Sequence, residues 1–204
     1  MNDIEFSALM VSRVCHDLVG PLGAVVNGLE VLEDERDAAM REDALKLVTS
    51  SANQALARIQ FMRIAFGAAG SAGAELDLGE IGRLVEGLLE GGKVKLDWRV
   101  PHAYWAKDWA KLLMNATLLG ADSLPRGGTV VVEAAAGAPN FKITAAGQVA
   151  RLPEDVERTL KGEQIQSPVD ARGVQPHLTY KLARAVNAAL AVKVGEGTVE
   201  ITGG

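Results

Sequence analysis

The stretch "CHDLVGPLGAVVNGLEVLEDE", residues 15–35, belongs to the pattern that decides the fold of the first third of the chain. Apolar residues recur at every third or fourth position from Ile4 to Leu32, a spacing typical of one face of a helix in a bundle or coiled coil. We call this set the first seam. Its members are Ile4, Ala8, Val11, Cys15, Leu18, Leu22, Val25, Leu29 and Leu32.

A second seam follows the acidic turn "EDERD" at residues 33–37. It consists of Leu45, Val48, Ala52, Ala55, Ile59, Met62 and Phe66. Two long helices joined by a short polar turn predict an antiparallel helical hairpin over residues 1–66. One hairpin leaves much apolar surface uncovered, so we expect two identical hairpins to pair as a four-helix bundle in a homodimer.

Three poor helix formers, Gly20, Pro21 and Gly23, interrupt the first predicted helix. Glycine costs about 1 kcal/mol and proline about 3 kcal/mol relative to alanine inside a helix. Pro21 also removes the amide that would bond the carbonyl of Asp17, which predicts a bend just beyond His16. In the heptad frame His16 follows the seam residue Cys15, so its side chain is expected on the rim, facing water.

Small and polar residues share the helical face of His16, because residues three or four positions apart are neighbours on a helix. They are Arg13, Asp17, Gly20, Ala24 and Asn27. The small residues in this set would let the backbone of another protein approach the imidazole. We therefore expect a partner-binding face formed by Arg13, Gly20, Ala24 and Asn27.

Residues 67–76, "GAAGSAGAEL", are small and nearly uncharged, which predicts a linker. The pattern then changes, and residues 77–204 are expected to form an α+β domain with one mixed sheet covered by helices on one face. Helices are predicted at 77–92, 105–124, 154–162 and 176–190, strands at 93–100, 129–136 and 140–147, and a hairpin at 191–203.

Composition excludes several classes of protein. The 204 residues carry a formal net charge of −5 and no long basic run, so non-specific nucleic-acid binding is not expected. A single cysteine excludes an internal disulfide framework. The N-terminus lacks the pattern of a signal peptide, and no run approaches the roughly 18 apolar residues of a membrane span. We expect a cytoplasmic protein without a membrane partner.

The order H-D-L-x-x-P-L, formed by His16, Asp17, Leu18, Pro21 and Leu22, resembles the phosphoacceptor box of sensor histidine kinases. The resemblance implies that His16 accepts a phosphoryl group. It leaves Asp17 either as a group that orients the imidazole or as a solvated rim charge. Arg13 either stabilises the transferring phosphoryl group or pairs with Asp17 one turn along the helix.

The second domain resembles the GHKL-type ATP-binding domain of the same kinases. Asn115 in "MNA" matches the asparagine that holds Mg²⁺ in those enzymes. The D-x-G-x-G motif is replaced by "ITAAGQVARLPEDV", with Ala145 or Ala146 at the aspartate's place, and the later glycine-rich lid retains only Gly173. We therefore expect a Bergerat-like fold whose ATP site is degenerate, with Asn115 serving structure.

A phosphoacceptor hairpin followed by a degenerate ATP domain resembles the histidine phosphotransferases of alphaproteobacterial phosphorelays that control the cell cycle. That family passes phosphoryl groups between the receiver domain of a hybrid kinase and those of downstream response regulators. The resemblance implies that His16 is the carrier, that the receiver supplies Mg²⁺, and that this chain binds no cofactor or metal of its own. Two alternatives remain: an active histidine kinase with an atypical ATP site, and a non-catalytic dimeric module that binds receivers.

Overall fold

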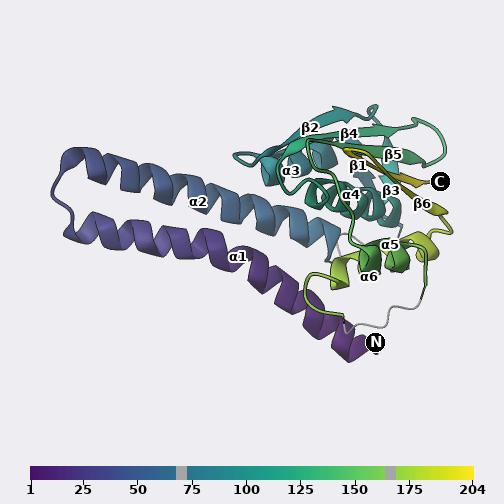
Figure 1. Cartoon of the computed structure of the whole chain (residues 1–204), viewed down its shortest axis with the longest axis horizontal. Coiled ribbons are helices and arrows are strands. Elements are labelled where there is room, and N and C mark those ends of the chain that lie inside the picture. The colour runs from purple at the N-terminus through teal and green to yellow at the C-terminus, as the bar shows by residue number, and fades with distance from the viewer. Residues whose placement is uncertain (68–72, 164–168) are drawn as a thin grey trace.

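The computed structural model describes residues 1–67, 73–163 and 169–204. Its first part is a long antiparallel hairpin of α1 (Asp3–Asp34) and α2 (Ala38–Ala65), which projects from a compact α/β part (Figure 1). Reciprocal hydrogen bonds between Asn2 and Glu5 cap the start of α1. Asp37 caps α2 by accepting bonds from two backbone amides. The predicted helical hairpin is confirmed.

Small residues hold the two helices of the hairpin together. A Cβ placed on Gly28 would lie 2.6 Å from Val48 Cγ2, so α1 and α2 approach closely at this point. Ala44, Ser51 and Ala55 are buried on the facing side of α2. Several of the larger residues of both seams are instead exposed within one chain. Exposed seam residues include Ile4, Val11, Leu22, Leu29, Leu45 and Ile59.

The helix α1 changes direction near its middle (Figure 1). Pro21 lies inside this helix and is buried. Its backbone nitrogen carries no hydrogen to donate, and its ring crowds the preceding turn. Both effects are recognised causes of helix bending. The helix nevertheless continues through Pro21 to Asp34. The predicted bend therefore occurs within one continuous helix.

The second part contains a mixed five-stranded sheet in the order β2-β4-β5-β7-β6. The pair β2–β4 is parallel and the other three pairs are antiparallel. The strands are β2 (Val94–Arg99), β4 (Gly128–Ala134), β5 (Phe141–Ala146), β6 (Leu190–Gly195) and β7 (Thr198–Gly203). The accompanying helices are α3 (Leu78–Leu89), α4 (Lys107–Asp122), α5 (Glu154–Leu160) and α6 (Val174–Ala185).

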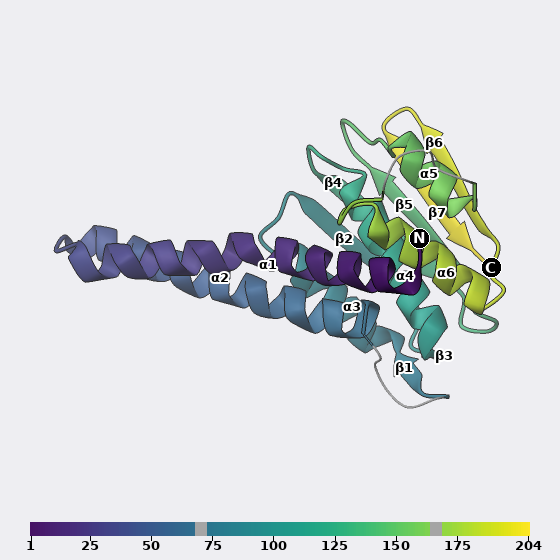
Figure 2. The same ribbon diagram turned by 90° about the horizontal axis from the view of Figure 1, so that it is seen from below.

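These helices cover one face of the sheet (Figures 1 and 2). Alternate residues of the central strands point toward them, as Val199 and Ile201 of β7 do, and both are fully buried. The predicted α+β architecture is confirmed.

A second, two-stranded sheet was not expected from the sequence. It pairs β1 (Glu75–Asp77) with β3 (Tyr104–Ala106) in antiparallel register. Three residues are too few to give a recognisable alternation, and β3 occupies the start of the helix expected at 105–124. The expected linker at 67–76 includes residues 68–72, which lie outside the described part, and its last two residues begin β1.

Both helices of the hairpin contact the α/β part. The N-terminal half of α1 runs beside α6 (Figures 1 and 2), and Lys181 Nζ of α6 lies 4.6 Å from the ring centre of Phe6. The C-terminal end of α2 packs on α3 and α4. These two junctions connect the hairpin to α3, α4 and α6.

By length and composition alone, α1 could cross a membrane, with a mean hydropathy of 1.3 over its most apolar window. Only 11% of that window is buried within the chain. A single helix of this kind is weak evidence for a membrane span, because a helix that packs in a bundle meets the same criterion.

Candidate functional site

The imidazole of His16 lies on the outer side of α1, with 55% of its side chain exposed. The expectation that it faces water is confirmed. Its Nδ1 lies 3.1 Å from Oδ1 of Asp17. A carboxylate can only accept hydrogen bonds, so this contact assigns the proton to Nδ1. In the neutral imidazole the other ring nitrogen, Nε2, then carries the lone pair.

Arg13 and Asp17 form a shielded ion pair one turn apart on α1. Arg13 Nε donates to Oδ2 of Asp17 over 2.7 Å, and the two side chains are only 11% and 13% exposed. The pairing of Arg13 with Asp17, one of the two roles considered from the sequence, is therefore present. Asp17 thus uses one carboxylate oxygen for Arg13 and the other for His16.

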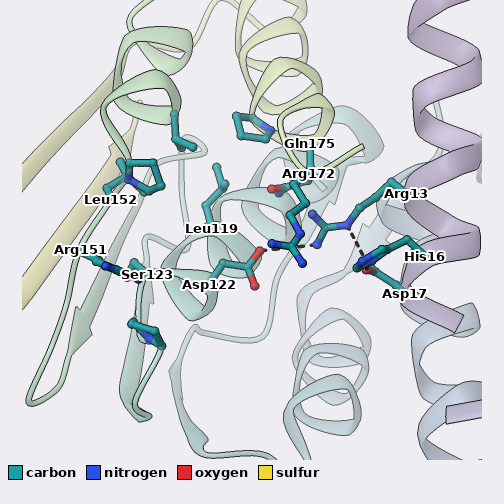
Figure 3. A pocket seen from close by; sticks show the side chains of 14 residues that line it. Arg13, His16, Asp17, Leu119, Asp122, Ser123, Arg151, Leu152, Arg172 and Gln175 are labelled. Carbon is teal, nitrogen blue, oxygen red and sulfur yellow. Dashed lines mark hydrogen bonds and ion pairs between the residues drawn. The ribbon is translucent and has the colours of Figure 1, made fainter. Parts of the chain in front are cut away.

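Arg13 also reaches across to the α/β part. Its terminal nitrogen Nη2 lies 3.6 Å from Oδ2 of Asp122, at the last position of α4 (Figure 3). This distance is longer than that of a direct hydrogen bond but short enough for an ion pair. A continuous series of charged contacts therefore leads from Asp122 through Arg13 and Asp17 to the imidazole of His16.

The protein atoms packed around Asp122 raise the pKa of its carboxyl group. The charge of Asp17 adds to this rise, and Arg13 opposes it. About half of the Asp122 side chain, 52%, is open to the groove, so solvent weakens the effect of burial. Asp122 is therefore a carboxyl group whose ionised form is disfavoured by its surroundings and supported by Arg13.

An open groove of about 440 Å³ separates α1 from the α/β part beside His16 (Figure 3). Arg13, His16 and Asp17 line it from α1. The opposite wall comes from the end of α4, the segment before α5 and the start of α6. Arg151 and Arg172 stand on that wall and are exposed. This wall could not be predicted from the sequence, because its residues lie far from His16 along the chain.

The remaining predicted contact residues lie further along α1. Gly20 and Asn27 are exposed and Ala24 is partly exposed, but none of the three lines the groove. A Cβ on Gly20 would meet no atom within 4 Å, so the space beside it is open. The predicted partner-binding residues therefore lie in two places: Arg13 inside the groove, and the other three on the helix beyond it.

Asn115, the residue that resembles a kinase Mg²⁺ ligand, is fully buried. Its Nδ2 donates to the carbonyl oxygens of Ala65 and Lys111 at 3.0 and 2.9 Å, and Gln175 Nε2 lies 3.5 Å from its Oδ1. Asn115 thus connects α2, α4 and α6. Across the described residues, no group of three or more His, Cys, Asp or Glu side chains could hold a metal ion.

Ala145, one of the two candidates for the aspartate's place, and Gly173, the one glycine retained from the lid, are both engaged in protein contacts. Ala145 is fully buried within β5, where it is paired with Val130 and Val199. The amide of Gly173 donates to Oδ1 of Asp170 over 2.8 Å, so this amide is already engaged at the start of α6.

Comparisons with known proteins agree on one family. Residues 78–198 match the family model described as the histidine phosphotransferase C-terminal domain. The protein phosphotransferase ChpT of Brucella abortus (strain 2308) is 38% identical over 194 residues, which cover 94% of this chain and 91% of that protein. A solved bacterial phosphotransferase superposes with a TM-score of 0.90 at 34% identity, covering 100% of this chain and 98% of the other.

The family match spans more than half of the chain, and the relative from Brucella covers nearly all of it. The helical hairpin followed by the α+β domain is the architecture that the solved phosphotransferase shares with the chain. The chain belongs to the histidine phosphotransferase family and functions as a phosphorelay histidine phosphotransferase.

Proposed function

We propose that His16 is the residue that carries the phosphoryl group in this phosphotransferase. The observation that supports this role most directly is the contact of Nδ1 with Asp17, which in the neutral ring places the proton on Nδ1 and the lone pair on Nε2, on an exposed side chain. A nucleophile must present its lone pair to a partner's active site, and Nε2 of His16 meets both requirements. Phosphorelay partners of this kind are receiver domains that carry an aspartyl phosphate.

In the first step, Nε2 of His16 attacks the phosphorus of the donor's aspartyl phosphate. The P–N bond forms as the anhydride P–O bond breaks, and the electron pair leaves with the donor's carboxylate. The proton stays on Nδ1, where Asp17 stabilises the positive charge that develops on the ring. In the second step, the acceptor's carboxylate attacks the phosphorus, the P–N bond breaks and its electron pair returns to Nε2.

Such transfer depends mainly on positioning and on neutralising the phosphoryl charge. We propose that the receiver supplies the Mg²⁺ ion and that this chain contributes the nucleophile and a docking face. Gly20, Ala24 and Asn27 are the proposed docking residues on α1, because they continue the face of His16 and leave room for another backbone. The proposed donor is a hybrid kinase receiver, and the acceptors are downstream response regulators in the cytoplasm.

We also propose that the α/β part does not use ATP. Its buried Asn115 bonds protein groups, and the amide of Gly173 is taken by Asp170. Phosphate binding needs backbone amides that are free to point at the ligand. These contacts support a domain that retains the fold of an ATP-binding domain for structural purposes.

A homodimer is the proposed state of the chain. Val11, Leu22 and Leu29 on α1 are exposed, and Leu45 and Ile59 on α2 are exposed as well. Exposed apolar surface on this scale marks an interface, and a second hairpin would cover it as a four-helix bundle. We propose this partner, and not a membrane, as the cover for the apolar face of α1.

The relay test uses a receiver domain carrying a radiolabelled aspartyl phosphate, this protein and a second receiver domain. The wild type is expected to move label to the second receiver, and His16→Ala is expected to move none. His177→Gln is the matched control and should relay as the wild type does. Equal relay by His16→Ala would contradict the assignment, and labelling of the wild type by ATP and Mg²⁺ alone would contradict the loss of ATP use.

The dimer test measures mass by sedimentation. Leu29→Glu places a charge in the proposed interface and is expected to give monomers, whereas the wild type sediments as a dimer. Val194→Glu on β6 is the control, because Val194 is equally exposed outside the hairpin. A monomeric wild type would contradict the proposed dimer.

A further inference from the structure

We propose that Asp122 of α4 is a positioning residue for phosphoryl transfer: it holds Arg13 so that Asp17 keeps one carboxylate oxygen for the imidazole of His16. The proposal rests on the proposed role of His16 as the carrier. It assigns the α/β part a direct share in preparing the nucleophile, through a side chain that the sequence did not single out.

Arg13 binds Asp17 through one of its nitrogens only. An arginine and a carboxylate commonly form two parallel hydrogen bonds, with the guanidinium fork on both oxygens. Here only one such bond to Asp17 is formed, from Nε of Arg13 to Oδ2. Nη2 of Arg13 points instead toward Oδ2 of Asp122 (Figure 3).

The other carboxylate oxygen of Asp17 remains available to His16. Oδ1 of Asp17 lies 3.1 Å from Nδ1 of His16 and fixes the proton there. If Arg13 turned its fork fully onto Asp17, Oδ1 would become a partner of the guanidinium. A charge-assisted bond to arginine is stronger than one to a neutral imidazole, so Oδ1 would be drawn from His16. Asp122 prevents this turn by holding the other end of Arg13.

The charge of Asp122 can be removed without an expected loss of folding stability. The surroundings of Asp122 raise the pKa of its carboxyl group, so the ionised form is less favourable in the folded chain than in the unfolded chain. Loss of this charge is therefore not expected to weaken the fold. A lower transfer rate in a variant of Asp122 would then reflect the site and not a loss of folded protein.

The first readout is the tautomer of His16 in the unphosphorylated protein, measured by nitrogen NMR on chains labelled at histidine. The resonances of His16 are assigned by their loss in His16→Gln. The wild type is expected to carry the proton on Nδ1, and Asp17→Asn is expected to change the ring's proton distribution. Asp122→Asn should shift it in the same direction, and Asp122→Glu should restore the wild-type pattern at least in part.

The second readout is the rate of transfer from a phosphorylated receiver domain. Asp122→Asn is expected to lower it about tenfold, which corresponds to about 1.4 kcal/mol in activation free energy. In an Asp17→Asn background, the same change should have no further effect, because the two residues act in series. Asp108→Asn is the matched control: the same substitution at the opposite end of α4, away from Arg13.

The proposal is overturned if Asp122→Asn leaves both the His16 tautomer and the transfer rate unchanged while Asp17→Asn alters them. It is also overturned if Asp108→Asn lowers the rate as much as Asp122→Asn does. The NMR measurement does not depend on phosphoryl transfer, so failure of the proposed carrier role, seen as relay by His16→Ala, is a separate result.

Discussion

The side-chain amide of Asn115 on α4 donates a 3.0 Å hydrogen bond to the carbonyl oxygen of Ala65, the last residue of α2. The bond is buried and joins the helical hairpin to the α/β part. The position that resembles a Mg²⁺ ligand of kinases thus fastens the end of the hairpin to the helix that carries Asp122.

Asn115→Leu is expected to lower the free energy of unfolding. The substitution leaves the carbonyl of Ala65 without this donor in a buried place, which costs about 1–3 kcal/mol. Urea denaturation of the purified protein measures the loss. Asn140→Leu is the control, since Asn140 is exposed and its bond to Ala138 is a local one of 3.3 Å. Equal losses in the two variants would show that the buried bond is unimportant.

A second prediction concerns the closest approach of α1 and α2. In Gly28→Ala the new methyl group would lie 2.6 Å from Val48 Cγ2, and a β-branched valine has little freedom to move aside. Overpacking of this kind costs about 1–3 kcal/mol, more than the 0.5–1 kcal/mol or so that alanine gains over glycine in a helix. Thermal or urea unfolding should therefore show a less stable protein.

Gly23→Ala is the control on the same helix. A Cβ at Gly23 meets no atom within 4 Å, so only the gain in helix propensity remains. This variant is expected to be more stable than the wild type by about 0.5–1 kcal/mol. The same sign of change in Gly23→Ala and Gly28→Ala would refute close packing at Gly28.

The hairpin and the mixed sheet could be predicted because their signals are local and periodic. The first seam repeats at three and four residues over the length of α1, and the strands near the C-terminus alternate around a glycine turn. Such patterns do not say which chain covers the seam. Several large seam residues, such as Leu22 and Leu29, proved to be exposed within one chain, while Gly28 lies in the contact between α1 and α2.

The candidate site also contains contacts that could be predicted from the sequence and one that could not. His16 and Asp17 are adjacent in the sequence, and Arg13 is one helical turn away, so their association could be predicted. The contact of Arg13 with Asp122 could not, because it depends on how the α/β part docks on α1. The short strands β1 and β3 were missed for a different reason: their pairing is defined by backbone bonds across the chain, with too few residues for a pattern.

Acid is expected to destabilise the protein partly through His177. Burial lowers the pKa of the His177 imidazole, and the Lys181 ammonium and the N-terminal amine lower it further. Between this lowered pKa and the value of about 6.5 in an unfolded chain, the unfolded state binds a proton that the folded state does not. The contribution of His177 to stability is therefore unfavourable below about pH 6.5 and vanishes above it.

His177→Gln removes the titrating group while keeping a polar side chain of similar reach. The free energy of unfolding of this variant should fall less between pH 7 and pH 5 than that of the wild type, as measured by urea denaturation at both pH values. Lys181→Gln removes the neighbouring cation and should reduce the loss in part. A pH dependence identical to that of the wild type in both variants would refute this role of His177.

Gly20→Ala tests whether the face of α1 beyond His16 receives the partner. Gly20 precedes Pro21, and a Cβ before proline disfavours the helical conformation, which offsets the usual gain from alanine. We therefore expect the free energy of unfolding to stay within about 0.5 kcal/mol of the wild-type value.

The new methyl group of Gly20→Ala would occupy open space on the proposed docking face. Displacing a bound receiver there by a fraction of an ångström is expected to slow phosphoryl transfer at least about fivefold. A transfer rate unchanged by Gly20→Ala would place the docking face elsewhere, because the fold of this variant is expected to be unaffected.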